Sequence, residues 1–218
     1  MACPSGEAMR RREFIRLVSG AVAAWPFTVR AQQSDRMRRI GVLTGTRAGD
    51  PAVEARRAAF EQALQQLGWT PGRNVRIDYR FAGGDAATSR KLAEELVALA
   101  PDVIVSTGSF STGHLLRVTH TVPVVFAIVP DPVGSGFVDS LSQPGGNATG
   151  FMMFEYGLSG KWLELLKEIA PGLTRAIVLW DPAITAGIGQ FTIIQSVATS
   201  AGVDLKPVNL SEIGRAHV

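Results

Sequence analysis

Apolar residues recur along the chain in two alternating patterns, one typical of buried strands and the other of amphipathic helices. Residues 39–43 form a short apolar run that ends in a Thr-Gly turn, which predicts a buried strand. A helix should begin at Asp50 and Pro51, an N-cap acceptor followed by proline at the first helical position, and end at Gly68. One face of this helix carries four apolar residues, Phe60, Ala63, Leu64 and Leu67.

The alternation of strand and helix continues along the chain. Further strands are predicted at 75–81, 103–105, 122–129, 176–180 and about 205–210, and further helices at 85–100, about 110–119, 158–169 and about 187–201. The helix over 158–169 carries an apolar stripe of Leu158, Trp162, Leu165, Leu166 and Ile169. Strands that alternate with helices predict an α/β fold with parallel sheets flanked by helices.

Two lobes are expected from the distribution of these elements. The most turn-rich stretch, 143–147, is the predicted crossing point between a first α/β lobe over 38–150 and a second over 151–212. The second lobe shows only about two or three strands, fewer than the roughly four to six of an ordinary sheet, so we expect it to be incomplete. The last residues, 213–218, resemble a translated sequencing adapter and are expected to be an artefact.

The first 31 residues have the pattern of an export leader, with Met9 as its natural start. The segment 11–16 resembles a twin-arginine signal, and an ordinary Sec leader is the alternative. Five arginines and two glutamates in the leader account for the whole formal charge of +3, so the rest of the chain is balanced. Without a concentrated positive face, nucleic-acid binding is not expected.

Catalytic and metal-binding patterns are absent from the sequence. Cys3, the only cysteine, lies ahead of the apolar part of the leader, and the chain has no nucleophile elbow, Walker loop or His-Glu-x-x-His motif. His114 and His120 have no metal-ligand spacing. We therefore predict a protein that is not an enzyme, with no catalytic residues, no metal and no cofactor.

Polar residues follow the predicted strands, at the edge where open parallel sheets bind ligands. The candidate ligand-binding residues after the first-lobe strands are Thr44, Gly45, Ser106, Thr107, Gly108, Ser109 and Asp131. Tyr156 lies near the predicted crossing, and Asp181 follows a strand of the second lobe. Hydroxyls and free amides there suit a carboxylate. Helix capping by Ser and Thr, and turn formation at the two Asp-Pro pairs, are the alternative explanations.

The chain resembles the ABC-transporter substrate-binding family that includes tryptophan-binding-like periplasmic proteins. The resemblance covers 39 to about 210 and is carried by the phrases at 39–43, 68–75, 122–126, 131–138 and 144–150. It implies a type I periplasmic-binding fold, in which two lobes close on a ligand, and it implies a longer second lobe than this chain has. Thr44, Thr107, Gly108, Ser109 and Asp131 match positions of the ligand cleft.

The implied function is that of the periplasmic solute-binding component of an ABC importer. It would capture a small polar ligand, such as an amino acid or related carboxylate, as a soluble monomer and pass it to a permease in the inner membrane. A ligand-sensing domain of a signalling system is the first alternative, and an exported α/β enzyme is the second.

Overall fold

The computed structural model describes residues 36–182 and 184–210, so the predicted leader and the predicted tail lie outside the described residues. The strands are β1 (Arg38–Thr44), β2 (Val75–Phe81), β3 (Val103–Thr107), β4 (Val124–Val129), β5 (Ala148–Met152), β6 (Arg175–Trp180) and β7 (Asp204–Asn209). The helices are α2 (Pro51–Gln66), α3 (Ala86–Ala98), α4 (Gly108–Val118), α5 (Leu158–Ile169) and α6 (Thr185–Ser200).

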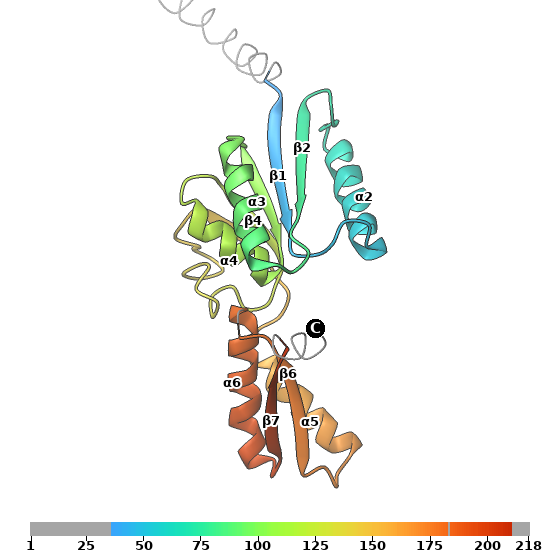
Figure 1. Cartoon of the computed structure of the whole chain (residues 1–218), viewed down its shortest axis with the longest axis vertical. Helices are drawn as coiled ribbons and strands as arrows, with labels where there is room; N and C mark the ends of the chain where they lie inside the picture. The colour runs from blue at the N-terminus through green and yellow to red at the C-terminus, as the bar shows by residue number, and fades with distance from the viewer. Residues whose placement is uncertain (1–35, 183, 211–218) are drawn as a thin grey trace, which may run out of the picture.

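The strands form two separate parallel sheets. The larger sheet has the order β2-β1-β3-β4-β5, and the smaller one pairs β6 with β7. We call β1 to β5 with α2, α3 and α4 the first lobe, and β6 and β7 with α5 and α6 the second lobe (Figure 1). The predicted α/β class, with parallel sheets flanked by helices, is confirmed.

Helices cover both faces of the larger sheet. On one face, α3 and α4 bury the main core, which includes Leu43, Leu96, Ile104, Leu115 and Phe126. On the other face, Phe60 and Leu64 of α2 pack near Ile40 and Val42 of β1. Alternate residues of β1 pack on opposite faces of the sheet, because successive side chains of a strand point in opposite directions.

Local signals place the starts of α2 and α3 where the sequence predicts them. The Asp50 carboxylate accepts the N–H of Ala52 at 2.8 Å, and Pro51 opens α2. The Asp85 carboxylate accepts the N–H of Thr88 at 2.7 Å in the same way before α3. These side chains satisfy amides that have no partner within the helix.

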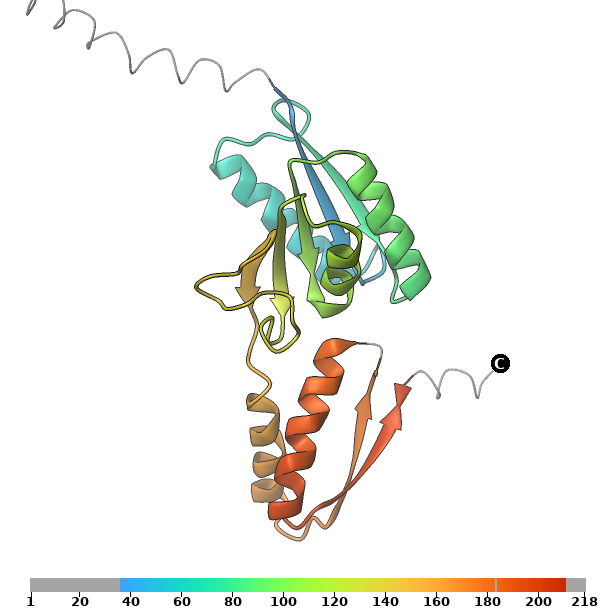
Figure 2. The same ribbon diagram turned by 90° about the vertical axis from the view of Figure 1, so that its left-hand side faces the viewer.

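The carboxyl ends of both sheets point toward the junction of the two lobes (Figure 2). The strands of the first lobe run toward the second lobe, and β6 and β7 run toward the first. The predicted residues that follow β1, β3, β4 and β6 are therefore on facing edges.

One prediction about local structure is wrong, and two others differ in detail. The stretch 143–147 is not the crossing point, because the chain first adds β5 to the larger sheet and crosses at 153–157. Helix α4 begins at Gly108, two residues before the predicted start near Phe110, so Ser109 lies in its first turn. The predicted apolar face of α2 is only partly buried: Leu67 is 76% exposed.

The predicted stripe of α5 does not face the core either. Leu163 is its buried apolar residue, packed against Ala198 and Val203, whereas Trp162 and Leu165 are exposed. The face that packs is set by α6, which lies beside α5 and approaches it closely at Gly160. Among the described helices, none is long and apolar enough to cross a membrane.

Candidate functional site

The order of strands reverses between β1 and β3. The chain leaves β1 through α2 to form β2 on one side, and returns through α3 to form β3 on the other. Thr44 and Thr107 are register partners at the carboxyl ends of these two strands. Crevices outside such a reversal point are the usual ligand sites of open α/β sheets, so the structure brings two of the predicted residues together there.

Helix α4 starts directly at this edge. Gly108 has φ +78°, a left-handed conformation that residues with a Cβ atom rarely adopt, and it turns the chain from β3 into α4. Thr107 is the N-cap residue, but its side chain makes no capping hydrogen bond. The first amides of α4 therefore lack a side-chain acceptor, and they carry the partial positive charge of a helix N-terminus.

Four hydroxyl side chains surround this helix start. Ser109 Oγ and Ser111 Oγ are buried and have no hydrogen-bond partner among the described residues. Ser106 is fully buried, and its Oγ accepts the Thr112 hydroxyl at 3.0 Å. A buried hydroxyl without a partner costs about 1–3 kcal/mol. Both hydroxyls lie in the first turn of α4, beside helix amides that have no side-chain cap.

The end of β1 closes the same site from the other side. A Cβ atom at Gly45 would lie 3.1 Å from Phe110 Cδ1 and 3.4 Å from Ser111 Oγ. The hydroxyls of Thr44 and Thr46 are 2.9 Å apart and share a hydrogen bond. Glycine at position 45 thus lets β1 approach the start of α4 closely.

Asp131 and Tyr156 lie together at the crossing between the lobes. The two Asp131 carboxylate oxygens accept the N–H groups of Gly134, at 2.7 Å, and Tyr156, at 3.3 Å. The Tyr156 hydroxyl lies 2.6 Å from Ser135 Oγ, and only 8% of the residue is exposed. Burial raises the pKa of the Tyr156 phenol and the Asp131 carboxylate adds to this, while the bond to Ser135 opposes it.

Asp181 follows β6, on the edge of the second lobe that faces the first. Beside it, the Trp180 ring stacks on Phe191 of α6, with centroids 4.9 Å apart. The carbonyl of Asp181 accepts the N–H of Ile184 at 3.2 Å. None of these contacts joins Asp181 to the residues at the start of α4, so its role in ligand binding stays a prediction.

Sequence reasoning missed Ser111, Thr46, Ser135 and Gly189. Ser111 could have been found from the Ser-x-Ser-Thr run over 109–112, because a hydroxyl two residues into a helix still lies near its N-terminus. Ser135, which bonds the Tyr156 hydroxyl, and Gly189 of α6, against whose backbone the Tyr156 ring lies, have no local signal. Their contacts join segments that are distant in sequence.

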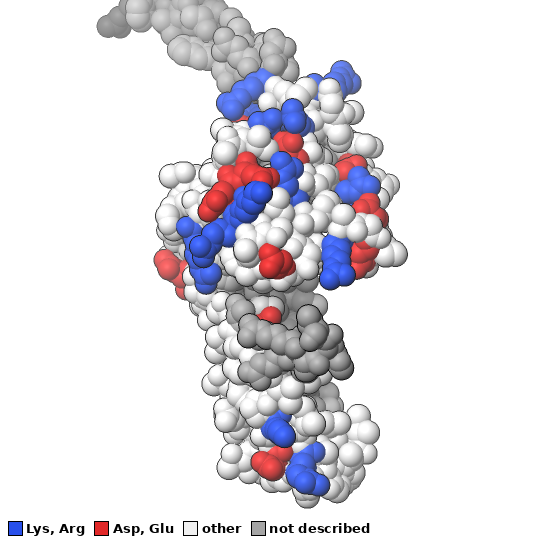
Figure 3. All heavy atoms as spheres, in the orientation of Figure 1, with Lys and Arg blue, Asp and Glu red and all other residues white. Residues whose placement is uncertain are grey.

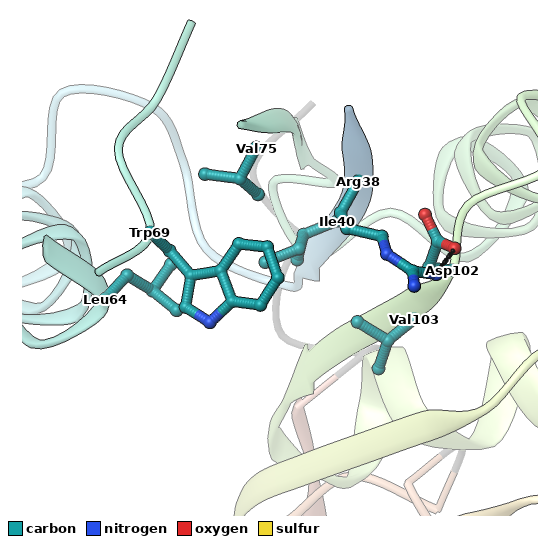
Figure 4. A pocket seen from close by; sticks show the side chains of 7 residues that line it. All are labelled: Arg38, Ile40, Leu64, Trp69, Val75, Asp102 and Val103. Carbon is teal, nitrogen blue, oxygen red and sulfur yellow. Dashed lines mark hydrogen bonds and ion pairs between the residues drawn. The ribbon is translucent and has the colours of Figure 1, made fainter. Parts of the chain in front are cut away.

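A cavity of about 480 Å³ lies at the opposite, amino end of the sheet. Figure 4 shows Trp69, Leu64 and Ile40 along one side of it and the pair formed by Arg38 and Asp102 along the other. Because Arg38 Nη1 lies 2.8 Å from Asp102 Oδ1, these charged groups already satisfy each other. This cavity offers no unpartnered polar group comparable to Ser109 and Ser111.

Charged side chains are mixed in sign on the first lobe. Figure 3 shows Lys and Arg interspersed with Asp and Glu on the face that it presents. Several of these form close pairs, such as Arg57 with Glu54 at 2.6 Å. The face shown in Figure 3 therefore has no broad field of one sign for a polyanion.

The chain matches the family model of "ABC transporter substrate binding protein" over residues 46–214, and it belongs to this family. A curated relative, "Tyrosine-binding protein" of Clostridioides difficile (strain R20291), is 30% identical over 131 residues, which make up 60% of this chain and 37% of the relative. The family is one of solute-binding proteins.

Solved structures confirm the type I periplasmic-binding fold. A conserved domain protein from Vibrio cholerae is 29% identical, with a TM-score of 0.71 over 80% of this chain and 57% of that one. A Streptococcus pneumonia ABC domain in complex with L-Trp, at 24% identity, shares the fold with a TM-score of 0.69 over 79% of this chain and 57% of that one. The chain thus spans less than two thirds of the length of these relatives.

Proposed function

We propose that this chain is the ligand-capturing component of an ABC importer and that it binds an amino acid through its carboxylate. The observation that carries the proposal is the pair of buried, unpartnered hydroxyls of Ser109 and Ser111 beside the uncapped start of α4. A carboxylate there would accept the amides of α4 and the two hydroxyls, and it would be favoured by the helix dipole.

Six further predicted residues belong to the proposed site, whereas Asp131 and Tyr156 bind each other at the crossing between the lobes. Thr44, Gly45, Ser106 and Thr107 form its floor at the ends of β1 and β3, and Gly108 turns the backbone so that the α4 amides face the ligand. Asp181 is proposed to contact the ligand from the second lobe when the lobes close. Closure requires that the ligand bind the closed arrangement more tightly than the open one.

An aromatic amino acid is the first ligand to test. The curated relative is named for tyrosine, and a structural relative was solved with L-Trp. Direct calorimetric titration with L-tyrosine, L-tryptophan, L-leucine and glucose would separate an aromatic amino acid from other solutes. Ligand at about 100 times its dissociation constant should also add roughly 2.7 kcal/mol to the free energy of unfolding.

Matched serine variants test where the ligand binds. Ser109→Ala and Ser111→Ala should each weaken binding roughly tenfold, because each removes a hydrogen bond to a charged group. Ser89→Ala is the control, since Ser89 is also buried and without a partner among the described residues but lies in α3. Equal affinities in all three variants, or no binding of any amino acid by a folded, ligand-free sample, would refute the proposed site.

We further propose a periplasmic location, export through the leader, and a monomer that docks on an inner-membrane permease. The segment 11–16 supports the twin-arginine route. Replacing Arg11 and Arg12 with lysine should leave the precursor in the cytoplasm, as cell fractionation would show. Continued export of this variant would favour the Sec route instead.

A further inference from the structure

The segment between the lobes, 153–157, is fixed to the first lobe as far as Tyr156. The N–H of Met153 donates to the Val129 carbonyl at 2.9 Å, and the N–H of Asp131 donates to the Phe154 carbonyl at 2.8 Å. The Tyr156 amide and hydroxyl add the bonds to Asp131 and Ser135. The crossing segment therefore moves with the end of β4 rather than swinging freely.

Hydrogen bonds of the second lobe begin at the same place. The N–H of Ser159 donates to the Tyr156 carbonyl at 2.9 Å in the first turn of α5, and Leu158 donates to Glu155 at 3.1 Å. Gly157, which precedes α5, has no side chain and makes no side-chain cap. Tyr156 is thus the residue at which the hydrogen bonds of the two lobes meet.

The Tyr156 ring lies against bare backbone of α6. A Cβ atom at Gly189 would lie 2.1 Å from Tyr156 Cε2, far inside contact distance. Glycine within a helix lowers its stability by about 1 kcal/mol relative to alanine, so its presence in α6 is explained by the space that the ring needs. The side chain of Tyr156 is held by the first lobe, and its ring packs on the second.

The backbone that holds Tyr156 is itself in an unusual conformation. Asp131 has φ +39° and Ile128 has φ +59°, and the register between β4 and β5 shifts between Phe126 and Val129. A Cβ atom at Gly134 would lie 2.8 Å from the Asp131 carboxyl carbon. Positive φ values in residues other than glycine persist only where surrounding contacts impose them, and they collect at sites of function.

We propose that Tyr156 is the pivot on which the second lobe turns relative to the first, and that Asp131, Ser135 and Gly189 are the positioning residues that hold it. In this role Asp131 fixes the Tyr156 main chain, Ser135 fixes its hydroxyl, and Gly189 provides the bare backbone with which the second lobe turns against the ring. The inference deepens the proposed function, on which its relevance to ligand capture rests. The pivot itself can be tested without a ligand.

The test measures the distance between the lobes by double electron–electron resonance between two spin labels. Lys91→Cys on α3 and Gln195→Cys on α6 provide exposed attachment points in a Cys3→Ser background. Tyr156→Phe and Ser135→Ala remove the same hydrogen bond from either side, so each should broaden the distance distribution, and the double variant should broaden it no further. Loss of one such bond changes a two-state population by roughly threefold to tenfold.

Gly189→Ala should shift the mean distance, because the new methyl group displaces the ring. Gly172→Ala is the matched control, since a Cβ atom there meets nothing within 4 Å. If Gly189→Ala fails to fold by circular dichroism, Tyr156→Phe and Ser135→Ala decide the question, because both retain the packing. Distributions that match the control in both of these variants would overturn the pivot.

A second arm adds L-tyrosine to the labelled protein. A narrower or shorter distance distribution in the parent protein, weakened in Tyr156→Phe, would support both the pivot and ligand capture. Broadening in the variants together with no response of the parent protein to any amino acid would support the pivot and refute the proposed ligand. The two failures are therefore distinguishable.

Discussion

Thr44 and Thr107 stand opposite each other in the pairing of β1 with β3, at the carboxyl ends of the two strands between which the strand order reverses. At this point α2, which follows β1, and α4, which follows β3, leave for opposite faces of the sheet, which opens space above the strand ends. Helix α4 begins one residue after Thr107. The pairing therefore places free helix amides, two threonines and the buried Ser109 at one edge.

Gly108→Ala should lower the free energy of unfolding by about 1 kcal/mol, because φ +78° is strained for any residue with a Cβ atom. The variant should also weaken amino-acid binding, since relief of the strain moves the first amides of α4. Urea unfolding and calorimetric titration measure the two effects. Gly113→Ala, in the same helix and in ordinary contact with Phe137, is the control and should be neutral or stabilising. Equal stability of the two variants would contradict the prediction.

Gly150→Ala should destabilise the first lobe by about 3 kcal/mol, because the new Cβ atom would lie 2.0 Å from the Phe126 carbonyl oxygen, which is backbone and cannot rotate away. The pairing of β4 with β5 should be lost first. Thermal unfolding compared with Gly146→Ala, where a Cβ atom meets nothing within 4 Å, measures the effect. A Gly150→Ala protein as stable as Gly146→Ala would show that β5 does not pair at this register.

Asp102→Asn should lower the free energy of unfolding at neutral pH by roughly 1–2 kcal/mol. Asp102 accepts the Arg39 amide and the Arg38 guanidinium, each at 2.8 Å. The backbone bond from Arg39, followed by the bond from Arg38, lowers the pKa of Asp102. Its stabilising contribution is therefore complete above the unfolded-state pKa of about 3.9 and is lost as the pH falls through the lower, folded-state value.

Urea unfolding of the parent protein and of Asp102→Asn between pH 7 and pH 2 checks this dependence. The difference between the two curves should be constant near neutral pH and should shrink below about pH 4. Asp204→Asn, at the exposed start of β7, is the control for loss of a surface carboxylate. A difference that grew toward acid pH would reverse the sign of the argument.

Asn147→Ala should cost about 1–2 kcal/mol of the free energy of unfolding. The Asn147 side-chain amide donates to the Val122 carbonyl at 2.7 Å and to the Thr119 carbonyl at 3.3 Å, so it joins the start of β5 to the connection before β4. Asn147→Asp should be no more stable than Asn147→Ala, because it keeps the shape but loses both donors. Chemical denaturation compares the three proteins; an unchanged midpoint in Asn147→Asp would show that shape alone matters.

Sequence patterns predicted most elements of the fold because their signals are local. The alternating residues of β2 and the Asp50-Pro51 start of α2 act through their own strand or helix. The same reasoning failed for β5, a short strand with Gly150 at its centre and a glycine-rich turn before it. It failed again for α5, where the wider apolar stripe remains exposed and Leu163 packs on α6.

In the candidate site, too, the sequence predicted what depends on local signals and missed what depends on contacts between distant segments. The sequence predicted that Thr44, Ser106, Thr107 and Ser109 lie at one edge, because polar residues after parallel strands share one edge of a sheet. It did not indicate that Asp131 binds the Tyr156 amide.

By itself the sequence determined the class of the fold, the succession of strands and helices, and the edge at which a ligand is expected, since each follows from interactions among residues near one another in the chain. Only the tertiary structure decided which face of each helix is buried, where the chain crosses between lobes, and that Tyr156 packs against Gly189. Those features depend on contacts between distant segments, whose geometry is set by the packing of whole layers.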